Sequence, residues 1–164
     1  MIQVKICGRG GQGAKTAVEI LAKAANYEDK FFLAYPEFGP ERAGTPINAY
    51  FKLSDKEIRD RSPIENPEIV LVFDKTLEEY CNGLRENGKI IINSSEEKEH
   101  HFIDVNSILG KINIAPNITM LGALIKITNI LKKESVEKAI KDSFSDDIAE
   151  LNLKFFRRGY EEVK

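Results

Sequence analysis

The chain has 164 residues, of which 42% are hydrophobic and 30% are charged. This length suffices for the core of one domain but not of two ordinary ones, so we expect a single domain spanning residues 1–164. Its 24 Lys and Arg and 26 Asp and Glu residues give a formal charge of -2, which excludes a bulk electrostatic attraction for nucleic acid or anionic lipid.

The first part of the chain alternates strands and helices. We expect a strand over residues 2–7, a helix over 14–25 with a narrow stripe of small apolar residues, and a short strand over 31–34. Residues 35–46 contain three prolines and two glycines, which predicts a long loop. Residues 47–53 alternate between apolar and polar, as a half-buried strand does.

The second part continues this alternation and then becomes helical. After an irregular return over 58–67, the apolar run 69–73 predicts a central strand, followed by a helix over 75–84 and a strand over 89–93. Residues 102–105 could add one more strand. We expect an α/β fold with a mixed, largely parallel, Rossmann-like sheet flanked by helices, and a helical C-terminal part. Periodicity predicts three helices there, over residues 118–131, 135–144 and 147–156.

The turn between the first strand and the first helix is rich in glycine. Gly8, Gly10 and Gly13 fit the pattern GxGxxG, in which backbone N–H groups and a helix N-terminus bind a phosphate. In dinucleotide-binding proteins, an acidic residue at the end of the second strand also binds the ribose. The expected second strand ends at Ala34 and Tyr35 without one.

The same turn comes close to a P-loop. Lys15 comes one position too late, and because one residue turns a helix by about 100°, it would not reach over the phosphates. A merely tight turn explains Gly8 and Gly13, but four glycines in six residues exceed what a turn needs. We therefore predict an anion-binding or partner-binding site, with Lys15 as a supplement. It comprises Gly8, Arg9, Gly10, Gly11, Gln12, Gly13 and Thr16.

The proline-stiffened loop carries Phe38, Glu41 and Arg42, residue types that suit an interface. The alternative is a Glu41–Arg42 pair that only solvates the loop, and composition alone leaves the two interpretations level. Asp74, which ends the central strand, is equally compatible with a site residue of an open α/β sheet and with the cap of the next helix. No residue is assigned a catalytic or metal-binding role.

The sequence carries no recognisable targeting or membrane signal. Its first residues read as a strand rather than as a signal peptide, and no apolar run is long enough to cross a membrane. Cys7 and Cys81 form neither a CxxC pair nor a disulfide framework, which favours a reducing compartment. Two thiols are also too few for an ordinary iron–sulfur cluster. We expect a cytoplasmic protein with no nucleic-acid or membrane partner.

Two motifs, GRGGQG at residues 8–13 and YPEFGPERAGTP at residues 35–46, occur together and are followed by PEIVLVFD at residues 67–74 and by Asn117. In this order and spacing they resemble the gamma chains of the 2-oxoacid:ferredoxin oxidoreductases over nearly the whole chain. The sequence FGPER is most similar to that of the gamma chains of the pyruvate and branched-chain 2-oxoacid enzymes. Ala43, where a basic residue is common, departs from the family pattern, and this departure bears on the substrate class.

The resemblance implies a subunit rather than a complete enzyme, and one that is inactive in isolation. Such complexes oxidatively decarboxylate a 2-oxoacid with coenzyme A, giving an acyl-CoA, CO2 and reduced ferredoxin. The resemblance implies that the 2-oxoacid is pyruvate. The complex uses thiamine diphosphate with Mg, held mainly by the alpha and beta chains. Its iron–sulfur clusters lie in the beta chain and a ferredoxin-like delta chain.

For this chain, the resemblance implies no cofactor held by it alone. Its expected partners are the alpha, beta and delta subunits and ferredoxin. The glycine turn could contribute to the coenzyme A neighbourhood, and Phe38, Glu41 and Arg42 would orient the loop against the alpha or beta chain. The alternative is a free-standing nucleotide-binding or dinucleotide-binding α/β protein.

Overall fold

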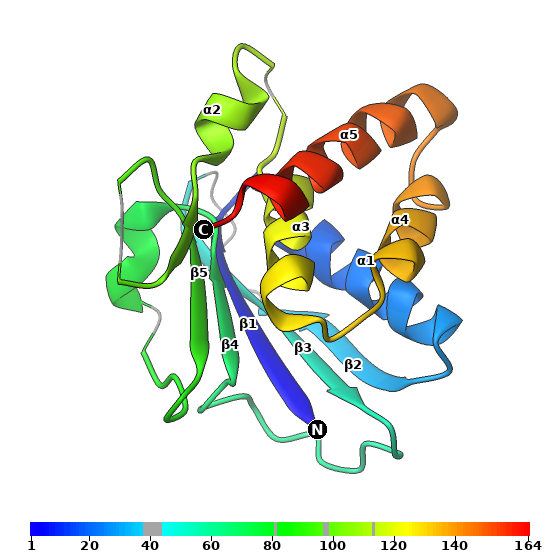
Figure 1. Ribbon diagram of the computed structural model, residues 1–164. Coiled ribbons are helices and arrows are strands. Elements are labelled where there is room, and N and C mark those ends of the chain that lie inside the picture. Colours follow the sequence, from blue (N-terminus) through cyan, green and yellow to red (C-terminus); the bar gives the residue numbers. More distant parts are fainter. Residues whose placement is uncertain (38–43, 81, 97–98, 113) are drawn as a thin grey trace.

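The computed structural model describes residues 1–37, 44–80, 82–96, 99–112 and 114–164. In this part of the chain, six strands form one sheet in the order β2-β3-β1-β4-β5-β6 (Figure 1). The pairs β1·β4, β4·β5 and β5·β6 are parallel, whereas β3 runs antiparallel between β1 and β2. The predicted mixed, largely parallel sheet is therefore confirmed. The strands are β1 (Ile2–Arg9), β2 (Phe31–Pro36), β3 (Pro46–Ser54), β4 (Ile69–Val72), β5 (Lys89–Asn93) and β6 (His101–Ile103).

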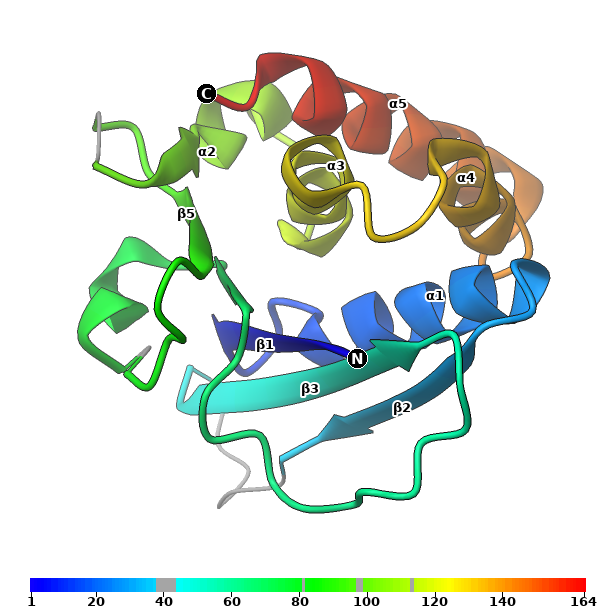
Figure 2. The same cartoon turned by 60° about the horizontal axis from the view of Figure 1, so that its bottom comes forward.

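Helices α1 and α3 lie against one face of this sheet, and α4 and α5 pack on them as an outer layer (Figure 2). α1 packs against β2 and β3, and α5 packs mainly on α3. Alanines 17, 24 and 25 of α1 are fully buried, which confirms the predicted stripe of small residues and lets the helix lie close to the strands. The helices are α1 (Ala14–Tyr27), α2 (Val105–Leu109), α3 (Asn117–Thr128), α4 (Lys133–Lys141) and α5 (Asp146–Glu162), with a 3-10 helix, η1, at Lys75–Tyr80.

The prediction of a helix over 75–84 was wrong. Of the described residues in this range, only those of η1 are helical, and the Leu77 N–H donates to the Asp74 carbonyl, three residues back, at 2.9 Å. Gly83 has a φ of 90° and lies so close to residue 65 that an added Cβ would be 2.3 Å from the Glu65 carbonyl oxygen. This contact with the irregular return requires a backbone that a helix does not provide.

Further differences lie in the C-terminal half, where α3 and α4 each end three residues earlier than predicted. α2 was not predicted, although Asp104 caps it by accepting from the Ser107 N–H at 3.0 Å. α5 was predicted to end at residue 156 but continues for six more residues through Gly159. A glycine usually weakens a helix interior, and here its close packing against α3 outweighs that cost.

α3 and α5 touch backbone to backbone at two glycines. A Cβ on Gly122 would lie 2.0 Å from the Phe156 carbonyl oxygen, and one on Gly159 would lie 1.9 Å from the Thr119 carbonyl oxygen. No real Cβ tolerates such a distance, so any larger residue at either position must push the helices apart. The pair therefore fixes how closely the outer helix sits on the inner one.

The opposite face of the sheet is covered in part by the irregular segment that includes residues 60–62. Lys52 of β3 is fully buried beneath it, and its Nζ donates to the Ser62 carbonyl at 2.7 Å and pairs with the Asp60 carboxylate at 3.3 Å. A buried ammonium group requires such partners. Lys52 thus attaches this segment to the sheet.

We predict that this attachment weakens in acid. Hydrogen bonds from Ser62, with a further contribution from Lys52, lower the pKa of Asp60 from 3.8 to about 2. A depressed pKa stabilises the folded state above the ordinary value, so the contribution is lost as the pH falls from about 4 towards 2. The protection of residues 58–64 against hydrogen exchange, taken relative to the intrinsic exchange rate at each pH, should fall in that interval. In Asp60→Asn this pH-dependent fall should be absent, and an unchanged fall would contradict this assignment.

Candidate functional site

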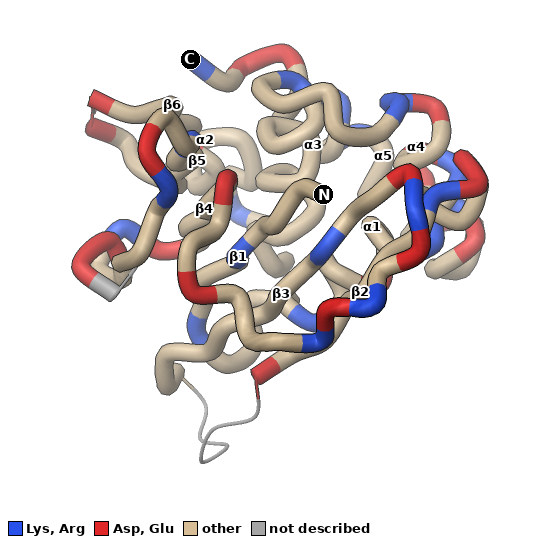
Figure 3. Tube along the Cα trace, turned by 90° about the horizontal axis from the view of Figure 1, so that it is seen from below, with Lys and Arg blue, Asp and Glu red and all other residues tan. Residues whose placement is uncertain are grey.

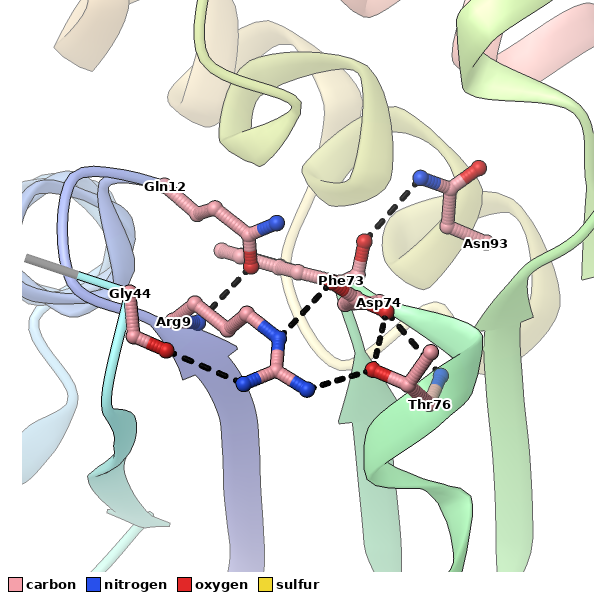
Figure 4. A network of polar contacts seen from close by, with 7 residues as sticks. All are labelled: Arg9, Gln12, Gly44, Phe73, Asp74, Thr76 and Asn93. Carbon is pink, nitrogen blue, oxygen red and sulfur yellow. Dashed lines mark hydrogen bonds and ion pairs between the residues drawn. The ribbon is translucent and has the colours of Figure 1, made fainter.

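β1 and β4 run in parallel, so the residues that follow them meet at one edge of the sheet. The glycine turn follows β1 there, and Asp74 comes two residues after the end of β4 (Figure 4). Open α/β sheets place their ligands at this edge. The structure thus brings the two features singled out in the sequence into contact.

The turn is closed by its own residues. The Arg9 N–H donates to the Gln12 side-chain oxygen at 2.7 Å, and the Gln12 N–H donates to the Arg9 carbonyl at 3.0 Å. Gly11 and Gly13 have φ values of 92° and 78°, which favour glycine. A Cβ at Gly8 would meet the Phe73 ring at 3.3 Å. Backbone conformation or close packing therefore explains why three of the four positions in the turn are glycine.

The N-terminus of α1 opens directly onto this turn. Its N-cap is Gly13, which has no side chain to accept from the first N–H groups, and no side chain of the described residues caps the helix. The first N–H groups of a helix have no intrahelical acceptor and carry about half a positive charge in sum. Thr16 lies half-buried in this first turn. An anion placed here would meet N–H donors, and the anion site predicted from the sequence stays a prediction.

Arg9 holds the turn to two other segments (Figure 4). Its Nε pairs with the Asp74 carboxylate at 3.0 Å, its Nη2 donates to the Thr76 hydroxyl at 2.6 Å, and its Nη1 donates to the Gly44 carbonyl at 3.0 Å. The Gly10 N–H also donates to the Thr45 carbonyl at 3.0 Å. The guanidinium thus links the glycine turn to the end of β4 and to the chain just before β3.

Asp74 caps the 3-10 helix that follows β4 and also contacts the glycine turn. One carboxylate oxygen accepts from the Thr76 N–H at 3.0 Å, as a helix cap does, and the other pairs with Arg9. Partial burial by itself raises the pKa of Asp74, but hydrogen bonds from Thr76 and then from Arg9 outweigh burial, and the pKa lies below its ordinary value. Asp74 therefore stays ionised and keeps Arg9 in place.

Asn117 is a site residue that sequence reasoning missed. It is 5% exposed, and its side-chain amide donates to the Gly13 carbonyl at 3.1 Å. It begins α3, so the N-termini of α1 and α3 meet at this contact. The two residues are 104 positions apart, and no local pattern signals their approach. Phe38, Glu41 and Arg42, the predicted interface residues, lie outside the described residues.

The geometry disagrees with both nucleotide-binding alternatives. The Lys15 side chain is 65% exposed and its Nζ lies 3.9 Å from Glu19, away from the turn. β2 does not neighbour β1, because β3 lies between them. A dinucleotide fold needs the second strand beside the first, where its last residue reaches the ribose. Among the described residues, neither a P-loop lysine nor a ribose-binding acid is therefore in place.

Comparison with known proteins decides the family. The model of the family "Pyruvate ferredoxin/flavodoxin oxidoreductase" matches residues 3–162. The chain belongs to this family. Its relatives include the common gamma subunit of the pyruvate/ketoisovalerate oxidoreductases of Thermococcus litoralis, 40% identical over 99% of this chain and 97% of the relative. Pyruvate synthase subunit PorC of Methanocaldococcus jannaschii is also 40% identical, over 99% and 97%.

Solved structures agree with this membership of the pyruvate ferredoxin/flavodoxin oxidoreductase family. The crystal structure of the pyruvate oxidoreductase subunit PORC of Thermotoga maritima has a TM-score of 0.87 and 35% identity, over 99% of this chain and 97% of that one. A 2-oxoglutarate:ferredoxin oxidoreductase from Magnetococcus marinus has a TM-score of 0.82 at 16% identity, which shows the fold alone. There, the fold occupies 30% of a longer chain.

The predicted family and its subunit character are thereby confirmed, and the free-standing nucleotide-binding alternative is not favoured. The relatives are named as subunits of an oxidoreductase, so this family member is a subunit of a complex with further chains. The helices of the described residues are each too short or too polar to cross a lipid bilayer. No three His, Cys, Asp or Glu residues of the described part of the chain are grouped as metal ligands.

Proposed function

We propose that this chain is the gamma subunit of a cytoplasmic 2-oxoacid:ferredoxin oxidoreductase complex whose substrate is pyruvate or a related 2-oxoacid. The observation that carries the proposal is the near-complete overlap, at 40% identity, with subunits named for pyruvate and ketoisovalerate. The complex would oxidatively decarboxylate the 2-oxoacid with coenzyme A and reduce ferredoxin. Thiamine diphosphate, Mg and the iron–sulfur clusters would be held by the alpha, beta and delta chains.

Within that complex, the glycine turn would bind an anionic group of coenzyme A. The open N–H groups at the start of α1 supply directed donors, and the dipole of the helix favours negative charge. The side-chain nitrogen of Gln12 points away from its bond with Arg9 and is available to the ligand (Figure 4). None of these residues is a nucleophile or general base, so their contribution is binding and orientation.

The first experiment is anaerobic purification of the chain from native cells, with mass spectrometry and a coenzyme A-dependent assay of 2-oxoacid oxidation. Alpha, beta and ferredoxin-like chains should co-purify with that activity, and the preferred 2-oxoacid identifies the substrate. A solitary chain that hydrolyses a nucleotide would overturn the proposal.

A substitution at the turn tests the coenzyme A contact. Gln12→Glu keeps the oxygen that accepts from Arg9 but replaces the free amide donor by a negative charge. We expect the KM for coenzyme A of the assembled complex to rise about tenfold, equivalent to about 1.4 kcal/mol, with kcat within about twofold. Glu19→Gln, on the exposed side of the same helix, is the control. An unchanged KM for coenzyme A in Gln12→Glu would mean that coenzyme A does not bind at the turn.

A further inference from the structure

The charge of Arg9 is compensated by the side chains that follow β4. Its Nε lies 3.0 Å from the Asp74 carboxylate, and the two side chains are 32% and 24% exposed. Thr76 closes a ring, because its hydroxyl accepts from Arg9 at 2.6 Å and donates to the second Asp74 oxygen at 2.6 Å. Figure 4 shows the guanidinium between Gly44 on one side and this pair on the other. All of its nitrogen atoms are thus bound to the chain itself.

The long-range field of the molecule is weak. Basic and acidic residues are interspersed along the trace (Figure 3), and the formal charge is -2. Lys15, in the first turn of α1, is 65% exposed and directed at Glu19. An anionic ligand of the glycine turn must therefore be held by short, directed bonds, whose strength depends steeply on where the donors lie.

The backbone of Arg9 transmits its fixed position to the turn. Its N–H donates to the Gln12 side-chain oxygen at 2.7 Å, and its carbonyl accepts from the Gln12 N–H at 3.0 Å. Gly10, the next residue, donates its N–H to the Thr45 carbonyl at 3.0 Å. A movement of Arg9 would therefore move Gln12, whose side-chain nitrogen is the proposed donor to coenzyme A.

The segment to which Arg9 is attached is itself fixed by the sheet. The Phe73 N–H, just before Asp74, donates to the Cys7 carbonyl at 2.8 Å. The Phe73 carbonyl accepts from the side chain of Asn93, the last residue of β5, at 3.0 Å. Three neighbouring strands, β1, β4 and β5, therefore hold Asp74 in one place.

We propose that Arg9 is a positioning residue for the coenzyme A site rather than a ligand of the anion. The inference rests on the proposed function, in which the glycine turn contacts coenzyme A. Through its ring with the two side chains that follow β4, Arg9 fixes the turn against the sheet. It thereby sets the position of Gln12 and of the first N–H groups of α1. A planar guanidinium suits this role, because it reaches several acceptors at fixed angles, whereas lysine presents one nitrogen atom.

Arg9→Lys separates position from charge. Lysine keeps the positive charge, but its one nitrogen atom cannot reach Asp74, Thr76 and Gly44 together. We expect the KM for coenzyme A of the assembled complex to rise about tenfold, with the KM for the 2-oxoacid within about twofold. Arg9→Met should give the same rise. If Arg9→Lys kept the ordinary KM for coenzyme A and only Arg9→Met raised it, the charge would be the active feature and the inference would be wrong.

Asp74→Asn gives opposite signs for the two roles. It removes the charge that compensates Arg9 and weakens the ring. A positioning role predicts that the KM for coenzyme A rises, and that adding Arg9→Lys raises it no further, because both changes break the same contact. A guanidinium that bound the anion would bind it more tightly once Asp74 was neutral. A fall in this KM would therefore contradict the inference.

Hydrogen exchange of the purified complex without coenzyme A measures the position directly. The protection of the Gly10 amide, which the Thr45 carbonyl accepts, should fall about tenfold in Arg9→Lys. Arg157→Lys is the matched control, because Arg157 also forms a two-bond contact, with Glu137. It should leave this protection and both KM values within about twofold of those of the unaltered complex.

Gln12→Glu distinguishes a failure of this inference from a failure of the proposed contact. If it raises the KM for coenzyme A while both Arg9 variants leave that KM and the Gly10 protection unchanged, the inference alone is overturned. If the KM is unchanged in every variant, coenzyme A does not bind at the turn and both are overturned. Because a KM does not depend on how much complex has assembled, poor assembly lowers the rate without changing one KM alone.

Discussion

Gly159→Ala should lower the free energy of unfolding by about 3 kcal/mol or more, the upper range for overpacking. The added methyl group would meet the Thr119 carbonyl oxygen, a backbone atom that no rotamer change can move. Relief requires α5 to shift away from α3, which opens the contact at Gly122 as well. Urea denaturation of the isolated chain measures the loss.

Lys154→Ala is the matched control for this prediction, because Lys154 is an exposed residue of the same helix. Alanine is the better helix former by a small margin, so its free energy of unfolding should stay within about 0.5 kcal/mol of the unaltered chain. If Gly159→Ala also stayed within that range, the helices would not touch backbone to backbone as described.

Gly13→Ala should abolish most of the coenzyme A-dependent activity of the assembled complex. A Cβ at this position would lie 2.3 Å from the Asn117 side-chain nitrogen, and the φ of 78° costs a non-glycine residue about 1–2 kcal/mol. The start of α1 must then move relative to α3. A displacement of about 1 Å at a binding site can cost about 100-fold in rate, and we expect a loss of that order.

Gly11→Ala separates the collision from the strain. Gly11 has a comparable φ of 92°, but a Cβ there would meet nothing within 4 Å. Gly11→Ala should therefore show only the cost of backbone strain, with a much smaller loss of activity. Equal losses in the two variants would mean that the contact with Asn117 does not position the turn. Steady-state assays with varied coenzyme A distinguish the two results.

Local patterns predicted most elements of the fold because their signals lie within one segment. The apolar run of β4 and the small-residue stripe of α1 are examples. The predictions failed where a distant contact decides the conformation. The backbone conformation at Gly83 is set by the close contact with the Glu65 carbonyl and is not helical. Gly159 stays helical because α3 lies against it. Neither contact leaves a trace in the neighbouring sequence.

In the candidate site, too, local features could be predicted from the sequence and contacts between distant residues could not. The glycine turn and Asp74 could be located from strand ends and turn residues, and the parallel pairing of β1 with β4 brings them together. The role of Arg9 could not be predicted, because its partners come from two distant segments that meet the glycine turn only in the fold. The contact of Asn117 with the Gly13 carbonyl could not be predicted for the same reason.

The position of β1 in the sheet has a consequence for folding during synthesis. Although β1 comes first in the chain, its Ile6 pairs with Ala49 on one side and with Leu71 on the other. At about 5–20 residues per second, the ribosome supplies the second neighbour only some seconds after β1. We expect α1, β2 and β3 to associate first, since their contacts are more local. The central strand would then acquire its full set of neighbours only when β4 docks.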